Sequence, residues 1–331
     1  MIPFSPLLLC RRRLLAGCGA GLLAFLASPL LRAWTIVKIS DRDYVTAKDI
    51  KEFYQFPTLE RSGRSVTFRS PRLVMRCRVG SNEVWINNVK FLLSLSVVEQ
   101  NDEVLISRID LSKLIDPILR PSHIASAQLF DTVVIDPGHG GHDTGARGTY
   151  GFEKTYTLDV GTRLGRLLQS RGIKVKMTRT SDTYPTLPQR VAMANATPNS
   201  IFVSVHFNHG QSRAEGIETY ALAPQGTSRS RKGENVTDDA RFRGNTRDSE
   251  NIALATAVHA SLLYQLRATD RGVMRDRWFV LKGVERPGIL VECGFISSPG
   301  EGGQVNNPQY RERLAIAIAT GIINYRNALR R

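Results

Sequence analysis

The chain has 331 residues, four of them cysteine, and a formal net charge of +15. Its length is enough for two domains, and so few cysteines exclude a fold built on disulfides. The basic surplus suits an anionic partner such as a cell wall or a membrane surface. Nucleic acid is not expected as a partner, because the sequence contains no nucleic-acid-binding motif.

The N-terminus has the layout of a bacterial export signal. Arg11-Arg12-Arg13 precedes an uncharged stretch, 14–31, and Ala33 offers a small residue for cleavage. We therefore predict an export signal over 1–33 and a location in the periplasm or cell envelope. The arginines followed by Leu14-Leu15 resemble a twin-arginine signal, which favours that export route. Two alternatives stay open, a lipid anchor at Cys18 and an uncleaved membrane-spanning anchor.

Loss of the signal would remove four arginines and no acidic residue, which lowers the formal charge from +15 to +11. Cys10 and Cys18 would leave with it. Cys77 and Cys293 would remain, and because they belong to different predicted domains we expect no disulfide between them.

Residues 34–120 are predicted to form a small α+β domain. Helical patterns occur near 46–54 and 110–116, and 120–123 reads as a linker. Short strand patterns lie at 65–68, 73–75, 83–86 and 104–107. The run 84–88 is similar to small modules named after the N-terminal domain of copper amine oxidases. The segment has no histidine, so no copper chemistry is expected; a wall-docking role and a purely structural role both stay open.

Residues 121–331 show strand and helix patterns in alternation. The strands are predicted at 132–136, 173–178, 201–206, 216–222, 278–281 and 288–292. The helices are predicted at 153–171, 188–196, 250–267 and 308–326. This alternation predicts an α/β domain with a mostly parallel twisted sheet covered by helices on both faces.

Chemically capable side chains follow the buried strands of this second domain. His139 lies in the glycine-rich turn after 132–136, His206 ends the strand 201–206, and Glu292 ends 288–292. Three such strand ends indicate a single site at one edge of the sheet. Glu153 opens the helix 153–171, where an acidic residue can also serve only to stabilise the helix N-terminus.

These residue types match the chemistry of catalytic zinc. Such zinc takes three protein ligands, commonly two histidines and a carboxylate, and leaves a position for water. A second carboxylate is then needed to move the proton. We predict that His139, Glu153 and His206 bind Zn²⁺ and that Glu292 is the general base. Asn208 is expected to line the site, because it lies two residues beyond His206 on the same strand face.

Other polar residues nearby are expected to have simpler roles. His142 and His209 are interpreted as solvated loop histidines, and His259 as a surface or half-buried residue of the helix 250–267. Arg179, Asp182 and Arg190 are expected to form ion pairs that hold loops.

The order of motifs from about 130 to 326 resembles the zinc-dependent N-acetylmuramoyl-L-alanine amidases of the AmiC type, the amidase_3 family. The motifs that carry the resemblance are 134–146, Glu153-Lys154, Thr178-Arg179, 202–208, 216–220, 270–272 and 290–297. The resemblance implies zinc ligands at His139, Glu153 and His206 and a catalytic glutamate at Glu292.

The resemblance also implies hydrolysis of the amide between N-acetylmuramic acid and the L-alanine of the stem peptide in peptidoglycan. The expected partners are peptidoglycan and an activator protein, and the chain is expected to be a monomer. Two alternatives stay open: a zinc peptidase cutting within the stem peptide, and a catalytically silent peptidoglycan-binding regulator.

The segment 225–250 has few apolar residues and admits two interpretations. One is a solvated, disordered insertion. The other is a regulatory lid near the site that supplies Glu234 or Glu250 to the metal, by resemblance to family members that carry an inhibitory helix.

Overall fold

The computed structural model describes residues 34–127, 129–230 and 240–330. The predicted export signal, 1–33, lies outside this part of the chain. Within the described ranges, no helix is both long enough and apolar enough to cross a membrane.

The N-terminal unit consists of short strands and short helices. Its strands are β1 (Ile36–Ile39), β2 (Arg42–Thr46), β3 (Thr58–Ser62), β4 (Ser65–Arg69), β5 (Val74–Arg78), β6 (Glu83–Ile86), β7 (Val89–Leu92), β8 (Val98–Gln100) and β9 (Glu103–Ser107). Its helices are α1 (Ala47–Phe53), α2 (Arg108–Asp110) and α3 (Asp116–Leu119), with a π-helical turn at Leu111–Ile115 and a 3₁₀ turn at Pro121–His123.

The second unit contains longer elements that alternate along the chain. Its strands are β10 (Thr132–Pro137), β11 (Lys174–Met177), β12 (Ser200–Asn208), β13 (Ile217–Leu222), β14 (Asp270–Asp276) and β15 (Gly288–Phe295). Its helices are α4 (Glu153–Gln169), α5 (Leu187–Asn195), α6 (Asp248–Leu266), α7 (Phe279–Gly283), α8 (Pro299–Asn306) and α9 (Pro308–Ala328), with a 3₁₀ turn at Arg243–Arg247.

One sheet of 11 strands runs through both units, in the order β11-β10-β12-β15-β13-β14-β7-β6-β5-β4-β3. Strands β10, β11, β12 and β15 are parallel, whereas β13 and β14 run in the opposite direction. The carboxyl ends of β10, β12 and β15 therefore share an edge with the beginnings of β13 and β14. A separate sheet of four strands, β1-β2-β9-β8, lies in the N-terminal unit.

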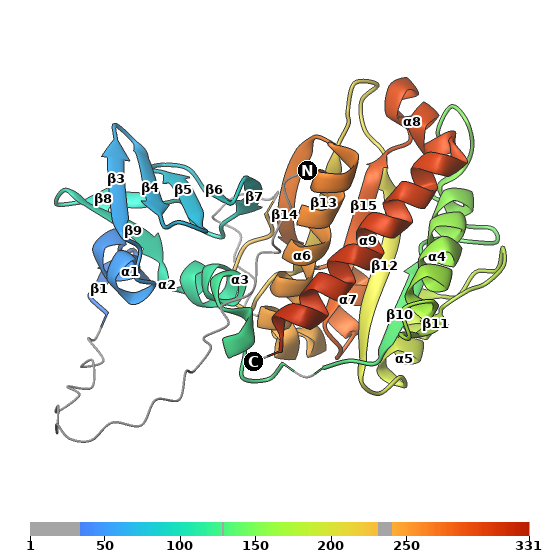
Figure 1. Cartoon of the computed structure of the whole chain (residues 1–331), viewed down its shortest axis with the longest axis horizontal. Helices are drawn as coiled ribbons and strands as arrows, with labels where there is room; N and C mark the ends of the chain where they lie inside the picture. The colour runs from blue at the N-terminus through green and yellow to red at the C-terminus, as the bar shows by residue number, and fades with distance from the viewer. Residues whose placement is uncertain (1–33, 128, 231–239, 331) are drawn as a thin grey trace, which may run out of the picture.

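Helices cover both faces of the sheet in the second unit (Figure 1). Helices α4, α6 and α9 contribute Leu164, Val258 and Ile318 to the large core, with the β-branched residues of β10 and β12. On the other face, Ala194 of α5 and Leu281 of α7 pack in a smaller cluster. The predicted fold class, a mostly parallel sheet with helices on both faces after a small α+β unit, is confirmed.

The strand predicted at 278–281 is wrong, because these residues begin helix α7. Trp278-Phe-Val-Leu is a short apolar run, and such a run does not distinguish a strand from a helix. The strand of this region is β14, which ends at Asp276, before α7 begins. Its charged residues hid it from a hydrophobic pattern. Cys77 and Cys293 are both buried and free, as predicted.

A buried ion pair joins the two units. Arg275 of β14 donates to Asp110 at 2.5 Å and to Ser94 Oγ at 2.7 Å, and the side chains of Arg275 and Asp110 are 2% and 0% exposed. Asp110 also accepts from Ser107 Oγ at 2.6 Å. The pairing of Phe91 in β7 with Val273 in β14 continues the sheet across the same junction. The segments on either side of residues 120–121 therefore share a sheet and a core.

We expect Asp110→Ala to lower the free energy of unfolding by about 3–5 kcal/mol, because it would leave the Arg275 charge buried without its partner. Chemical denaturation of the full chain measures this loss. Asp43→Ala is the control, since Asp43 pairs with Arg108 at the surface, where the Arg108 side chain is 62% exposed. That variant should lose less than about 1 kcal/mol. Equal losses in the two variants would contradict a structural role for the buried pair.

Candidate metal centre

His139, Glu153 and His206 meet at the edge of the sheet where β10 and β12 end. Each offers one donor atom, and these atoms lie within 4.8 Å of one another. His139 follows β10, His206 lies in β12, and Glu153 is the first residue of α4. The fold thus brings together three residues that are far apart in the sequence, at the sheet edge where the ends of the strands indicated a site.

The sheet register places the two histidines side by side. Pro137 of β10 pairs with Val205 of β12, and the Gly138 amide donates to the Val205 carbonyl at 3.0 Å. The next residue, His139, has a φ of 61°, which is uncommon for a residue with a side chain. The backbone is held in this conformation by Arg190, which donates to the His139 carbonyl at 2.7 Å.

Glu153 is a buried carboxylate that binds both histidines. Its Oε2 lies 3.0 Å from His139 Nε2, and its Oε1 lies 2.9 Å from His206 Nδ1. The backbone amides of Ala146 and Phe207 also donate to it, at 2.9 and 3.0 Å. Burial acts to raise the pKa of Glu153, but the hydrogen bonds from the two histidines outweigh it and hold this pKa well below its usual range. The group is therefore a charged carboxylate at neutral pH, the form that binds a metal ion.

A second carboxylate orients His139. Asp143 Oδ2 lies 2.8 Å from His139 Nδ1, and the Gly145 amide holds the other oxygen at 3.0 Å. Burial lowers the pKa of His139, but Glu153 and Asp143 raise it more, so the net shift is upward. Histidine ligands commonly carry such a carboxylate on the second ring nitrogen, which fixes the tautomer and the ring. The Asp143 contact leaves Nε2 of His139 directed at Glu153.

Gly138 leaves the space in which the His206 ring lies. A Cβ at this position would stand 2.2 Å from His206 Cε1. We therefore expect Gly138→Ala to displace the ring and weaken metal binding at this cluster by about 10- to 100-fold, as loss of a supporting contact does in metal sites. Competition with a chromophoric chelator measures the affinity. Gly300→Ala is the control, because no atom lies within 4 Å of its Cβ position; equal affinities in the two variants would contradict the expectation.

Buried arginines hold the loop that carries His139. Arg190 forms an ion pair with Asp136 at 2.7 Å, with side chains 3% and 1% exposed. Arg179 donates to the carbonyls of Pro137 and Gly138, each at 2.9 Å. Asp182 pairs with Lys154 at 2.7 Å. The loop-holding roles predicted for these three residues are confirmed, although Arg179 acts through carbonyl groups rather than through an ion pair.

Glu292 is placed next to the triad by the pairing of β15 with β12. His206 is the direct partner of Glu292 in this parallel pair, so both side chains leave the same face of the sheet. Glu292 is half-buried. A carboxylate in this position can exchange a proton with a group bound at the triad.

Glu218, which the sequence analysis assigned no role, flanks Glu292 on the other side. It is the partner of Glu292 in β13 and is fully buried. Arg271 pairs with it at 2.6 Å, Tyr220 donates at 2.7 Å and Asn208 donates at 2.9 Å. The two neighbouring carboxylates thus have different surroundings, since Glu218 is neutralised by an arginine. The motif 216–220 contains Glu218 and could have drawn attention to it. The sequence does not show which residues pair with a glutamate inside a strand.

Asn208 therefore lies at the border of the site, with its amide directed to Glu218. His142 and His209 are exposed, and the His142 ring lies 4.3 Å from the ring of Tyr184. The surface or half-buried position expected for His259 is wrong. This residue is 0% exposed and bridges Thr219 at 2.9 Å and Asp270 at 3.0 Å, because α6 packs directly on β13 and β14.

The proposed position of the segment 225–250 near the site is also wrong for its described residues. Strand β13 is antiparallel to β15, so it begins at the edge of the sheet that carries the metal triad and ends at the opposite edge. The residues that follow Leu222 therefore start from the edge opposite the triad. Glu250 is buried there, bonded to Arg247 at 2.9 Å and Ser126 at 3.0 Å. Glu234 lies outside the described residues. Periodicity alone did not reveal the reversed direction of β13.

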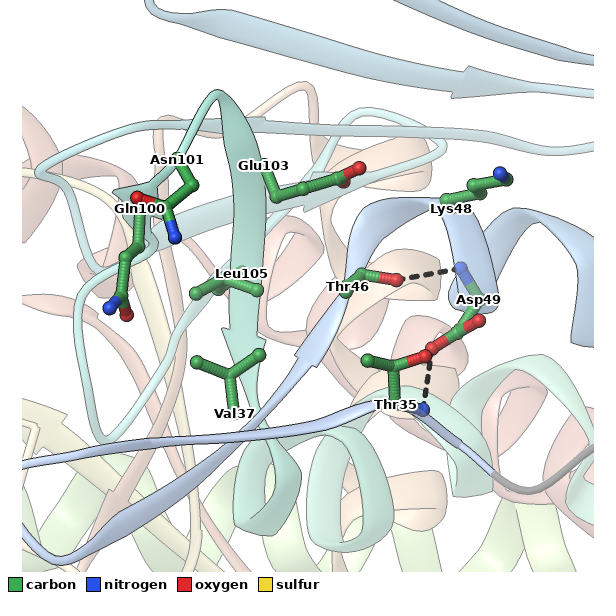
Figure 2. A pocket seen from close by; sticks show the side chains of 9 residues that line it. All are labelled: Thr35, Val37, Thr46, Lys48, Asp49, Gln100, Asn101, Glu103 and Leu105. Carbon is green, nitrogen blue, oxygen red and sulfur yellow. Dashed lines mark hydrogen bonds between the residues drawn. The ribbon is translucent and has the colours of Figure 1, made fainter.

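A cavity of about 300 Å³ lies in the N-terminal unit and contains none of the triad residues (Figure 2). Val37 and Leu105 of the four-stranded sheet line it, together with polar groups near the start of α1. There Thr46 accepts from the Asp49 amide at 3.0 Å, and Asp49 accepts from the Thr35 amide at 2.7 Å. Thr35, Thr46 and Asp49 thus bond to one another, and the metal triad is a separate feature.

A two-histidine, one-glutamate cluster at the carboxyl edge of parallel strands is the donor set of a metal-dependent hydrolase. Residues 133–324 match the family model Amidase_3, described as N-acetylmuramoyl-L-alanine amidase. The chain belongs to this amidase family. The predicted family and the predicted class of enzyme, a hydrolase of this amide, are confirmed.

Individual proteins agree with this assignment. The chain is 32% identical over 194 residues to the uncharacterized protein YqiI of Bacillus subtilis, a match that spans 59% of this chain and 84% of YqiI. It is 30% identical over 217 residues to the N-acetylmuramoyl-L-alanine amidase AmiA of Salmonella typhimurium, spanning 58% of this chain and 75% of AmiA. The solved amidase AmiC2 of Nostoc punctiforme is 30% identical, with a TM-score of 0.50, over 60% of this chain and 98% of AmiC2.

Proposed function

We propose that the chain is a zinc-dependent amidase that separates the stem peptide of peptidoglycan from N-acetylmuramic acid, with His139, Glu153 and His206 as the zinc ligands. The observation that carries the proposal is the cluster of their donor atoms within 4.8 Å. Two imidazole nitrogens and one charged carboxylate suit Zn²⁺, which prefers nitrogen and oxygen ligands of this kind. When bound, zinc would supply Lewis acidity at the amide carbonyl and lower the pKa of water.

Glu292 is proposed as the group that moves protons. Its position beside His206 lets the carboxylate take a proton from the attacking water and deliver it to the nitrogen of the departing L-alanine. Asp143 would keep His139 oriented through Nδ1, and Arg190 would keep the loop backbone in place. Glu218 is less suited to the proton transfer, because its charge is already paired with Arg271.

The site of action follows from the substrate and from the N-terminal sequence. AmiA is named for the same amide of the cell wall, and the arginine-containing leader 1–33 is typical of an exported protein. We propose that the enzyme works in the periplasm as a monomer. An activator protein remains a prediction for this chain.

Mass spectrometry of digested cell wall tests the proposal. An amidase should release stem peptides with a free L-alanine N-terminus and leave muramic acid in the glycan. Cleavage within the stem peptide would indicate the peptidase alternative. A protein that binds the wall but yields no product, with zinc present, would indicate the silent regulator.

A further inference from the structure

One transverse row of paired residues crosses the large sheet from the metal centre into the N-terminal unit. Directly paired residues in a sheet point to the same face. The registers of successive strands give this row from the metal centre outward: His206, Glu292, Glu218, Gly272, Lys90, Trp85, Arg76, Thr67 and, at the sheet edge, Glu60. The step from Gly272 to Lys90 is supported by contact, since a Cβ on Gly272 would lie 3.3 Å from Lys90 Cε.

The face that carries this row is open to solvent in the N-terminal unit. Phe91, Val84 and Cys77 point to the other face and are 0–3% exposed in the core. Lys90 and Trp85 are half-buried, and Arg76 is exposed. This part of the sheet is therefore packed on one face only.

A bulge brings Arg271 onto the same face. Ile217 pairs with Asp270 and Glu218 pairs with Gly272, which leaves Arg271 as the extra residue. Bulges next to active sites redirect side chains in this way. Its guanidinium covers Glu218 and lies 4.8 Å from the centre of the Phe295 ring, and the side chain remains 36% exposed. Arg271, Lys90, Trp85 and Arg76 are hereafter called the cationic row.

The cationic row has the length and chemistry to bind an extended acidic polymer. Six strand spacings separate β12, which carries His206, from β5, which carries Arg76, and at about 4.8 Å each they span roughly 29 Å. Arg76 donates to the neutral amide of Asn88 at 3.2 Å, so its charge is not cancelled by that contact. Trp85 offers a large rigid surface between the cations, on which a sugar ring can pack. Peptidoglycan combines sugar rings with stem-peptide carboxylates.

We propose that the cationic row binds the peptidoglycan next to the scissile amide, with stem-peptide carboxylates against Lys90 and Arg76 and a sugar ring against Trp85. The N-terminal unit is then part of the substrate-binding surface and favours polymeric wall over small fragments. This inference rests on the proposed function, because the cationic row belongs to the same transverse row of paired residues as His206 and Glu292.

The test compares the wild-type chain with a variant that carries Arg76→Ala, Trp85→Ala and Lys90→Ala together. Each protein is assayed on insoluble peptidoglycan and on a soluble muramoyl peptide. We expect kcat/KM on insoluble peptidoglycan to fall about tenfold, mainly through KM, since each exposed cation or aromatic contact contributes a few-fold. Hydrolysis of the soluble peptide should stay within about twofold. The control, Arg166→Ala with Arg171→Ala, removes two exposed cations from α4 and the turn after it and should leave both substrates unaffected.

A binding measurement separates failure of this inference from failure of the proposed function. Cosedimentation of Glu292→Gln protein with insoluble peptidoglycan should weaken about tenfold when the three substitutions are added. Unchanged binding and kinetics would overturn the inference, and so would an equal loss on both substrates. A loss seen only when cell extract is present would assign the row to a protein partner instead. If the wild-type chain were inactive on both substrates, the amidase proposal would be wrong. Cosedimentation would still show whether the cationic row binds insoluble peptidoglycan.

Discussion

Glu292→Gln should reduce kcat on peptidoglycan by about 100- to 10,000-fold, the usual contribution of a general acid–base group. The amide keeps the size of the carboxylate but cannot accept the proton from water. Because Glu292 lies beside the triad and is not one of its members, the variant should retain its zinc. Release of new amino groups from the wall gives the rate, and elemental analysis gives the metal content.

The control for this variant is Glu285→Gln. Glu285 is an exposed glutamate that pairs with Arg243. It precedes the start of β15, whereas Glu292 lies near the carboxyl end of that strand, so its substitution should leave the rate unchanged. If the Glu292→Gln variant kept a rate within a few-fold of the wild type, Glu292 would not be the general acid–base group. A loss of zinc from the same variant would place it among the ligands instead.

His206→Ala should abolish both stoichiometric zinc binding and activity, because it removes one of the three proposed ligands and one of the hydrogen bonds to Glu153. Treatment of the wild type with a chelator should abolish activity as well, and added zinc should restore it there but not in the variant. Elemental analysis of freshly purified protein provides the metal content.

His209→Ala is the matched control, since His209 lies three residues later and is exposed. It should keep one zinc per chain and the wild-type rate. Active, freshly prepared enzyme without stoichiometric metal would contradict the zinc assignment for the whole site. Full zinc content in His206→Ala would contradict the ligand assignment for this residue alone.

The edge of the sheet at which the site forms could be predicted because strand patterns are local. β-branched residues mark β10 and β12, and the polar residue that follows each one is visible in the sequence. Parallel strands then bring His139 and His206 together without further information. The zinc chemistry of the ligand set follows from the residue types.

The partners of charged residues within strands could not be predicted, because they depend on contacts between distant segments. Glu218 meets Arg271 across 53 positions, and Arg275 meets Asp110 across 165. Charged residues inside a strand also weaken its hydrophobic pattern, so β14 was missed. The junction between the two units is formed by β14, so it could not be predicted without that strand.

The pairing of β14 with β7 has a consequence for any fragment that begins near residue 121. Such a fragment would turn β14 into an edge strand, with unpaired backbone groups facing water. It would also uncover Arg275 and the apolar residues beneath it, Val273 among them. Exposed strand edges of this kind recruit other chains, so the fragment would be prone to self-association. The N-terminal unit thus covers the β14 edge of the hydrolase sheet.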